Sequence, residues 1–152
     1  MDKKASRKKL VLCQVGVLPY RLRKDDGLEI LLVSTKDYRK FTIPKGWLKK
    51  SWGKRKSARR EAEQEAGLIG KLSRKVYGSY SFHKRLNGEY VSIYVDVYLM
   101  MVEDQLEDWL EKNIRSFQWL SADEAVETVD QPQLASLISS LSLDPRLNGK
   151  HI

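Results

Sequence analysis

The strongest constraint on what this chain can fold into is a fixed spacing of unlike residues within one basic segment. Gly46 is followed by 13 residues, then by Arg60 and Glu61, with Glu65 four positions further on. A helix over the second half of this segment would bring residues three and four positions apart onto one face. Glu61, Gln64 and Glu65 would then present two carboxylates and one amide together, a set of oxygen donors suited to a hard cation.

A helix is predicted from about Ser57 to Ala66. Ser57 can act as the N-cap, because its hydroxyl can accept a hydrogen bond from a free amide of the first turn. The small residues Ala58, Ala62 and Ala66 share one face, so the helix is expected to approach a sheet closely. Gly67 follows, a residue suited to the left-handed conformation that ends many helices.

Strands are predicted on both sides of this helix. Residues 90–102 alternate between apolar and polar, a period of two that indicates a strand with one buried face. Pro44 disfavours helix at the residue before it, and the run Pro44-Lys45-Gly46 is expected to turn and begin a loop. The other predicted elements are strands at about 9–21, 28–34, 41–43, 71–84 and 116–120, turns at 24–27 and 86–88, a helix opening at Ser121 with Glu124 in a capping box, and a helix over 132–141.

The chain of 152 residues is interpreted as a single domain with two short extensions. Residues 1–9 are a basic N-terminal arm, 10–142 the domain and 143–152 a C-terminal tail. No run of 18 apolar residues and no secretory signal is seen, so no membrane partner and a cytoplasmic location are expected. Cys13, the one cysteine, lies in the apolar run LVLCQVGVL and is expected to be a small core residue.

Positive charge is concentrated in the first half of the chain. The net charge is +8, but residues 1–76 carry 22 Lys and Arg against 8 Asp and Glu, whereas residues 77–152 carry 6 against 12. This field suits an acidic, polyphosphate-like substrate, although Lys and Arg also simply solvate surface loops and helices. RNA would use the same charges, but helix-turn-helix, zinc-finger and RNP patterns are missing. Two His and one Cys exclude a conventional zinc site.

The segment from Gly46 to Leu68 resembles the Nudix box, Gly-x5-Glu-x7-Arg-Glu-U-x-Glu-Glu-x-Gly-U, in which U is aliphatic. Trp52 and Gln64 depart from the pattern, because each stands where the family has a glutamate. The run Pro44-Lys45-Gly46-Trp47 is similar to a bacterial group of diphosphoinositol and dinucleoside polyphosphate hydrolases. The positions that agree are Gly46, Arg60, Glu61, Glu65, Gly67 and Leu68, with Ala62 as a small residue in the aliphatic position.

The resemblance implies an α/β (α+β) fold, in which a mixed β-sheet is sandwiched between helices in an α/β/α arrangement. It implies a hydrolase that cuts a phosphoanhydride bond in a nucleoside-diphosphate-linked or other polyphosphorylated small molecule, of the dinucleoside or inositol polyphosphate type. Mg²⁺ is the implied cofactor, with Mn²⁺ as a substitute, because a hard cation neutralises charge on phosphoryl oxygens.

The resemblance also assigns roles to the matching positions. Glu61 and Glu65, with Arg60, are the implied catalytic residues. Glu61, Gln64 and Glu65 are the implied metal ligands, although the amide of Gln64 brings an oxygen without a charge and cannot act as a base. The implied substrate-binding residues are Lys45, Gly46, Lys49 and Lys50.

Several roles stay open at this point. Arg60 is expected to brace the loop through a backbone carbonyl or an acid, since position 52 is not a glutamate. His83 is either an acid/base group or incidental. The candidates for a general base or an extra metal ligand are Glu89, Asp96, Glu103 and Asp104, and the aromatic residues that either stack on a base or fill the core are Trp47, Trp52, Tyr80 and Tyr94.

Two alternative functions follow from the same residues. The first is a Nudix-fold protein that binds its ligand and turns it over weakly, because Gln64 lowers the negative charge of the metal site. The second is an RNA-binding protein or RNA 5′-end pyrophosphohydrolase of the same fold, which predicts salt-sensitive affinity for RNA. The sequence leaves the oligomeric state open.

Overall fold

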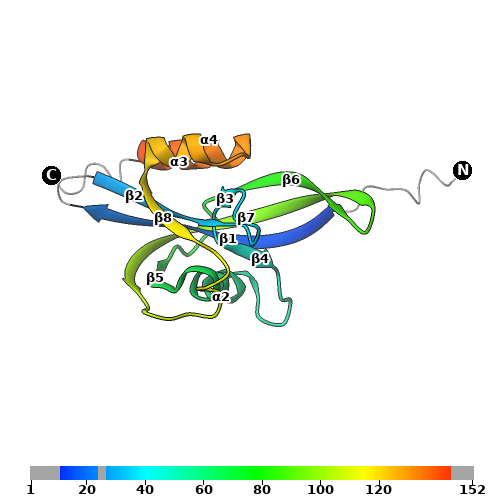
Figure 1. The fold of residues 1–152 in the computed structure, drawn as a ribbon, viewed down its shortest axis with the longest axis horizontal. Helices are drawn as coiled ribbons and strands as arrows, with labels where there is room; N and C mark the ends of the chain where they lie inside the picture. The colour runs from blue at the N-terminus through cyan, green and yellow to red at the C-terminus, as the bar shows by residue number, and fades with distance from the viewer. Residues whose placement is uncertain (1–10, 24–26, 145–152) are drawn as a thin grey trace, which may run out of the picture.

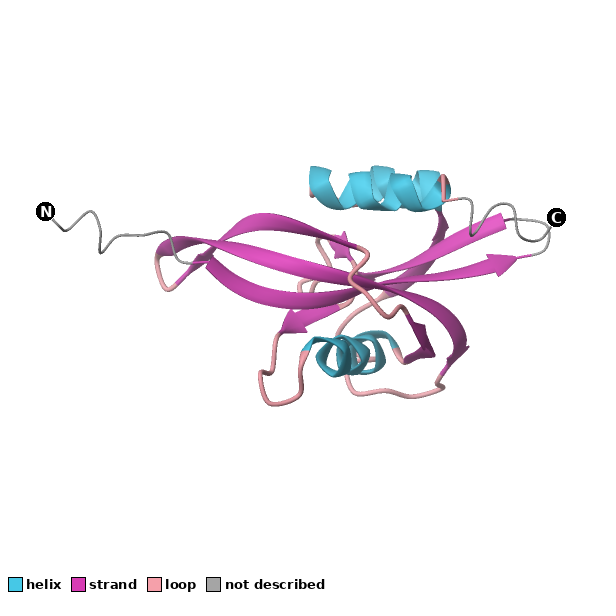
Figure 2. Ribbon diagram, turned by 180° about the vertical axis from the view of Figure 1, so that it is seen from behind, coloured by secondary structure: helices cyan, strands magenta, loops and turns pink. Residues whose placement is uncertain are grey.

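A mixed sheet with helices on both faces forms the described part of the chain, residues 11–23 and 27–144 of this computed structural model (Figures 1 and 2). Its strands are β1 (Val11–Arg23), β2 (Gly27–Ser34), β3 (Phe41–Thr42), β4 (Lys45–Trp47), β5 (Leu68–Leu72), β6 (Gly78–Leu86), β7 (Glu89–Gln105) and β8 (Phe117–Ser121). Its helices are α2 (Lys54–Ala66), α3 (Ala122–Thr128) and α4 (Pro132–Ser142).

The two longest strands, β1 and β7, run parallel through the centre of the sheet, in register from Val11 opposite Ser92 to Tyr20 opposite Met101. Each has two further antiparallel partners. One part of β1 pairs with β4 and the other with β2, while β7 pairs first with β6 and then with β5. β2 in turn pairs with β3 and β8. The central pair is therefore flanked by β4 and β6 towards one end and by β2 and β5 towards the other.

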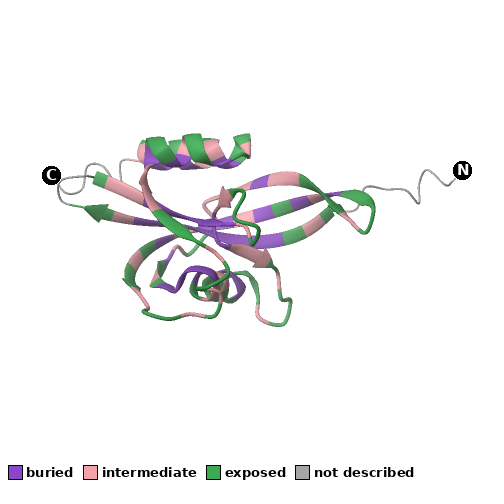
Figure 3. Ribbon diagram, in the orientation of Figure 1, coloured by how far each residue is buried: buried purple, intermediate pink, exposed green. Residues whose placement is uncertain are grey.

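The core has two layers, one on each face of the sheet. α2 lies on one face, where Ala58, Ala62 and Ala66 are fully buried against β1, β5 and β7. α3 and α4 lie on the other face, where Leu134, Ile138 and other apolar residues cover β6 and β7 (Figure 3). This arrangement confirms the predicted α/β/α sandwich, and the small residues explain how closely α2 approaches the sheet.

α2 begins three residues earlier than predicted. Its N-cap is Gly53, at φ 84°, and no side chain caps the helix there. Ser57 instead lies within the helix, almost fully buried, and its hydroxyl accepts a hydrogen bond from the amide of Lys49. The N-cap prediction was therefore wrong, because a glycine in the left-handed region starts the helix without a side-chain cap. The predicted end is confirmed, with Gly67 at φ 68°.

The run Lys45-Gly46-Trp47 is strand β4, which corrects the loop predicted after Pro44. β4 pairs antiparallel with β1, with Gly46 opposite Val15. Proline fixes an extended-compatible φ, and the carbonyl of Pro44 accepts a hydrogen bond from the amide of Val17 at 3.0 Å. Gly16 on β1 leaves room for this close pairing, since a side chain there would meet Ile43 and Lys45.

Two further predictions about strands were incomplete. The strand predicted over 71–84 is two strands, β5 and β6, joined by residues 73–77. The alternation in β7 gives one buried face only for its first half. Beyond Val97 both faces are covered, because Tyr98 and Met100 pack against the α2 layer while Leu99 packs against the α3–α4 layer. The turn at Asn87 and Gly88 is confirmed, both at positive φ.

Other predictions concern the edges of the fold. Cys13 is exposed rather than buried, because this end of β1 extends past the helices (Figure 1). The capping box of Ser121 and Glu124 is confirmed. The turn at 24–26, the arm 1–9 and most of the tail lie outside the described residues. Within the described ranges, no helix has both the length and the apolar character that a membrane crossing requires.

Candidate active site

Glu65 is the central acid of the site. It points from α2 towards β4, where its Oε1 accepts a hydrogen bond from the backbone amide of Lys45 at 3.3 Å. Only 6% of Glu65 is exposed. A carboxylate is rarely this buried unless it has polar or charged partners. Glu61 lies one turn earlier on the same face, half-buried, with its carboxylate against Gly46. The predicted convergence of these two acids is confirmed by the geometry.

Gly46 determines where the Glu61 carboxylate can lie. A Cβ atom added to Gly46 would overlap the carboxylate carbon and oxygens of Glu61. β4 and α2 therefore approach so closely that a side chain at position 46 would displace the Glu61 carboxylate. In this structure Gly46 acts on the position of Glu61, and its predicted contact with substrate stays a prediction.

Arg115 connects Glu65 to the segment between β7 and β8. Its Nη2 lies 3.4 Å from Oε2 of Glu65, and its Nε donates to Oε1 of Glu111 at 2.6 Å. Its Nη1 donates to the carbonyl of Ser34 at 3.0 Å. The amide of Glu111 also donates to the carbonyl of Gln64, so this segment is fixed to the last turn of α2. Sequence reasoning missed Glu111 and Arg115, because no spacing relates them to α2.

The two acids on α2 resist ionisation. Burial raises the pKa of Glu65 to about 8; Arg115 opposes this shift, while Glu61 and Glu111 add to it. Burial also raises the pKa of Glu61, against the hydrogen bond with Glu65. Two neighbouring carboxyl groups, one buried and one half-buried, share a proton readily, and a bound cation would favour the ionised form of both.

The donor set fits a hard cation such as Mg²⁺. Glu61 and Glu65 supply two carboxylates, and the side chain of Gln64 lies beside Glu61 with an amide oxygen. A set of few protein oxygens is compatible with Mg²⁺, which retains several waters. Across residues 11–23 and 27–144, however, no three His, Cys, Asp or Glu side chains converge as a metal cluster. The carboxylate that Gln64 replaces is the one this set lacks.

Arg60 lies against Trp52 rather than against the expected carbonyl or acid. Its guanidinium carbon is 4.5 Å from the centroid of the indole ring. Lys49 and Lys56 also lie over this ring, each with Nζ 5.2 Å from its centroid. The ring borders a pocket of about 170 Å³, the Trp52 pocket, which is lined by Trp47, Lys49, Trp52, Ser57, Arg60, Glu61 and Gln64.

Lys45 extends away from Glu65 into a second pocket. Its Nζ lies 3.2 Å from Oε1 of Gln14 and 4.7 Å from the centroid of the Phe82 ring. Burial lowers the pKa of Lys45 to about 8, although the charge of Glu65 opposes this. The pocket of about 230 Å³, the Lys45 pocket, is lined by Thr35, Lys40, Phe41, Thr42, Lys45, Tyr80, Phe82, His83, Lys84, Asp130 and Gln131.

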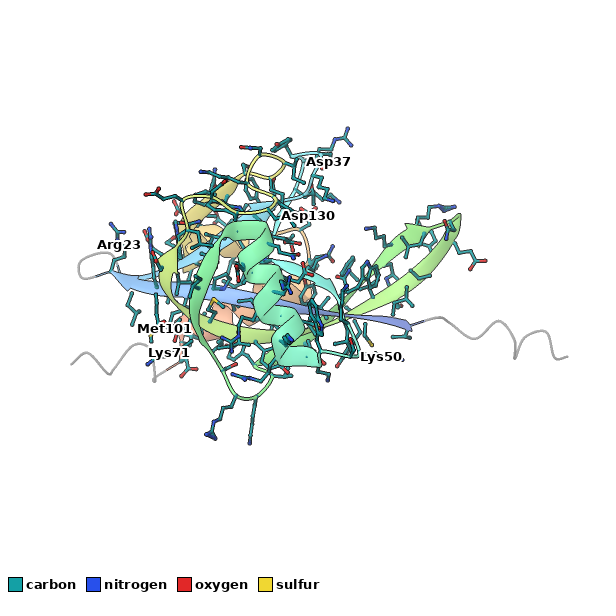
Figure 4. All side chains as sticks on the ribbon, turned by 90° about the horizontal axis from the view of Figure 1, so that it is seen from below. Arg23, Asp37, Lys50, Lys71, Met101 and Asp130 are labelled. Carbon is teal, nitrogen blue, oxygen red and sulfur yellow. The ribbon has the colours of Figure 1, made fainter. Side chains whose placement is uncertain are left out.

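The remaining candidates divide between these pockets and other places. Lys49 and Trp47 line the Trp52 pocket, whereas Lys50 lines neither pocket and is exposed at the N-terminal end of α2 (Figure 4). Tyr80 is buried in the core. Asp96 is engaged elsewhere, by Lys54 at 2.8 Å and by Ser79. Glu111, an acid outside α2, is linked to Glu65 by Arg115, which forms an ion pair with each of them.

The structure is an α+β sandwich in which α2 holds Glu61 and Glu65 against one face of a mixed sheet. The sequence model of the NUDIX domain matches residues 14–141. The chain belongs to the Nudix family.

Relatives in sequence support this membership. Nudix hydrolase 18, mitochondrial, of Arabidopsis thaliana is 31% identical over 117 residues, covering 73% of this chain and 65% of its own. Diphosphoinositol polyphosphate phosphohydrolase 2 of Mus musculus is 30% identical over 135 residues, covering 86% and 70%. Nudix hydrolase 4 of Arabidopsis thaliana is 33% identical, and the match covers 56% of its length. The chain thus spans less than two thirds of these Arabidopsis relatives.

Solved structures show the same fold. The Ap4A hydrolase of C. elegans superimposes with a TM-score of 0.65 at 18% identity, covering 88% of this chain and 98% of that one. The NUDIX domain of Shewanella oneidensis NrtR, solved with ADP ribose, gives 0.66 at 12% identity, with coverage of 93% and 92%. The Nudix fold of this chain is therefore established.

Proposed function

We propose that this protein is a Mg²⁺-dependent hydrolase that cuts a phosphoanhydride bond in a polyphosphorylated small molecule. The observation that carries the proposal is the pair of acids on one face of α2, the half-buried Glu61 and the buried Glu65. Glu61 lines the Trp52 pocket with Lys49, and the backbone amide of Lys45, whose side chain enters the second pocket, donates to Glu65. The pair offers negative charge to a cation, and the lysines offer positive charge to phosphates. Mn²⁺ can take the place of Mg²⁺ on the same oxygen donors.

The relatives support a polyphosphate substrate and leave its identity open. One is named for diphosphoinositol polyphosphates, and among structural neighbours one is named for Ap4A and another was solved with ADP ribose. All three ligands carry linked phosphates, which agrees with the basic first half of the chain. The run Pro44-Lys45-Gly46-Trp47 favours the diphosphoinositol or dinucleoside polyphosphate type within this set.

The residues around the acids have distinct tasks in the proposed reaction. A bound Mg²⁺ supplies Lewis acidity and lowers the pKa of water. Glu61 and Glu65 hold it, with the oxygen of Gln64 as a neutral third donor. Gly46 leaves room for the Glu61 carboxylate, and Arg115 orients Glu65. Positioning and charge neutralisation of this kind account for most catalysis of phosphoryl transfer.

The two pockets are proposed to bind different parts of the substrate. The Trp52 pocket contains Glu61 and Gln64 and therefore borders the metal ligands. The Lys45 pocket combines Phe41 and Phe82 with Lys40 and Lys84, which suits a ring that carries phosphate groups. Lys45 links this pocket to the acids, because its backbone amide donates to Glu65 and its side chain lines the pocket.

Gln64 supports a competing proposal, a protein of the same fold that binds its ligand but turns it over weakly. RNA remains an alternative ligand of the basic surface, and cytoplasmic residence remains a prediction.

A screen of phosphate release over nucleoside, dinucleoside and inositol polyphosphates tests the function. The parent, Glu65→Gln and Gln64→Glu are run in parallel with Mg²⁺. Release by the parent that Glu65→Gln abolishes supports the hydrolase. No release from any substrate by the parent, with release appearing in Gln64→Glu, would support the weakened binder instead.

A further inference from the structure

Three cations surround one aromatic ring beside the proposed metal ligands. Lys49 comes from the loop before α2, while Lys56 and Arg60 lie one turn apart on the helix. Their charged groups are 4.5–5.2 Å from the centroid of Trp52. Like charges repel at this spacing, so the ring is the group that gathers them, through the attraction of its negative face for cations.

No acid of the described chain neutralises this cluster, defined as Lys49, Lys56 and Arg60. Within residues 11–23 and 27–144, none of the three forms an ion pair with a carboxylate. Glu61 is the one acid that lines the Trp52 pocket, where Lys49 and Arg60 bring two positive charges. The pocket therefore presents an excess of positive charge.

The start of α2 brings further positive charge to this region without an acidic residue of its own. Its first turn holds no acidic residue and no side chain caps it, while Lys54, Arg55 and Lys56 are all basic. Cations at a helix N-terminus oppose the helix dipole and reduce helix stability. Lys54 and Arg55 are held by Asp96 and by the carbonyls of residues 72 and 73, but Lys56 points to the Trp52 ring.

Both departures from the Nudix box act in the same direction. Trp52 and Gln64 stand where the family pattern has glutamates, so the surroundings of Arg60 carry two fewer negative charges. A glutamate at position 52 would lie within reach of Arg60 and neutralise it. An indole at the same place holds Arg60 and leaves its positive charge available.

We propose that Trp52 positions Lys49, Lys56 and Arg60 as a binding site for substrate phosphate groups that works without a metal ion. The proposal deepens the proposed function and rests on it only in taking the anion to be part of the substrate. Lys49 and Arg60 contact the phosphate in the Trp52 pocket, Lys56 adds charge from the rim, and Trp52 is a positioning residue. The cluster would then hold the phosphate groups of the substrate even where the metal ion, with one carboxylate fewer, is bound weakly.

The test measures binding of inorganic tripolyphosphate to the full chain in EDTA by calorimetry. The parent is expected to bind, and Lys56→Gln and Trp52→Glu are expected to raise the Kd at least about tenfold. Trp52→Leu keeps every charge but removes the ring, and is expected to raise the Kd severalfold, whereas Trp52→Phe keeps a ring and should stay near the parent. Lys75→Gln, an exposed lysine outside both pockets, is the matched charge control.

Three outcomes would overturn the proposal. They are no binding by the parent in EDTA, equal loss in Lys75→Gln and Lys56→Gln, and a Trp52→Leu variant that is folded by circular dichroism and binds as the parent does. If a hydrolysed substrate is found, Trp52→Leu should raise KM with little change in kcat. Binding without any turnover in Mg²⁺ would sink the proposed function alone, so the two failures are distinguishable.

Discussion

The carboxylate of Glu61 fills the space that a side chain on Gly46 would occupy. Gly46 lies on β4 and Glu61 on α2, so this contact joins the helix that holds the two acids to the strand beside it. Since Gly46 is in an ordinary strand pairing with Val15, the need for glycine here is one of space rather than of backbone conformation.

Gly46→Ala is expected to displace Glu61 and lower kcat about a hundredfold, because small misplacements of catalytic groups are costly. Overpacking should also reduce the free energy of unfolding by about 1–3 kcal/mol. Steady-state kinetics and urea unfolding measure both effects. Gly88→Ala is the control: it places alanine at φ 82° in the β6–β7 turn, with no atom in its way, and should lose stability while keeping full activity.

The stability of the metal-free protein should depend on pH through Glu65. Its pKa is raised to about 8 in the folded state, against about 4.3 for an unfolded chain. Between these values the folded state binds the extra proton, so the free energy of unfolding should fall as pH rises from about 4.3 to 8. The contribution of Glu65 to this slope is at most about 1.4 kcal/mol per pH unit, and Glu61, whose pKa is also raised, adds to it.

Urea unfolding in EDTA across this range measures the effect, and Glu65→Gln should flatten the curve. Lys45 does not affect the curve in this range. Its pKa is lowered to about 8, so its titration makes the free energy of unfolding rise with pH only above that value. Parallel curves for the parent and Glu65→Gln would show that Glu65 ionises normally.

Arg115→Met should destabilise the fold by about 1–3 kcal/mol, because it removes hydrogen bonds from a buried guanidinium to Glu111 and to the carbonyl of Ser34, and leaves Glu65 without its cation. Urea unfolding at fixed pH measures the loss. Arg74→Met, at an exposed position, is the control and should change stability by less than about 0.5 kcal/mol. An equal loss in the free energy of unfolding for the two variants would show that the contacts of Arg115 in the site do not stabilise the fold.

Glu111→Gln is expected to lower turnover, whereas Asp96→Asn is not. Glu111 holds Arg115 against Glu65, so its loss should disturb the orientation of Glu65, the proposed catalytic acid. Asp96 was a candidate base from the sequence, but its carboxylate pairs with Lys54 and accepts a hydrogen bond from Ser79. Asp96→Asn should therefore cost only about 0–1 kcal/mol of stability. A larger loss of kcat in Asp96→Asn would reverse this assignment.

Local spacing was enough to predict the helix and its acids. Glu61 and Glu65 share a face because a helix repeats every 3.6 residues, and Gly67 ends it because glycine adopts positive φ readily. The start of the helix was predicted wrongly at Ser57, since Gly53 begins it without the side-chain cap that the prediction required.

Contacts between segments far apart in the sequence could not be predicted from local sequence patterns. Arg115 reaches Glu65 across 50 positions of sequence, and nothing in the residues around either predicts it. The pairing of β4 with β1 depends on the missing side chain of Gly16, and the burial of Tyr98 depends on α2 lying over that half of β7. Arg60 was expected to meet a carbonyl or an acid and meets Trp52, because the residue that replaced the acid also binds cations.

The initial rate of phosphate release from the best substrate of the screen, with Mg²⁺ and with EDTA, tests the catalytic role of the Glu61–Glu65 pair most directly. The parent should release phosphate only with Mg²⁺, and Glu65→Gln should be slower by about a hundredfold or more while remaining folded. Equal rates for the parent and Glu65→Gln, or release unaffected by EDTA, would contradict a metal-dependent reaction at these two acids.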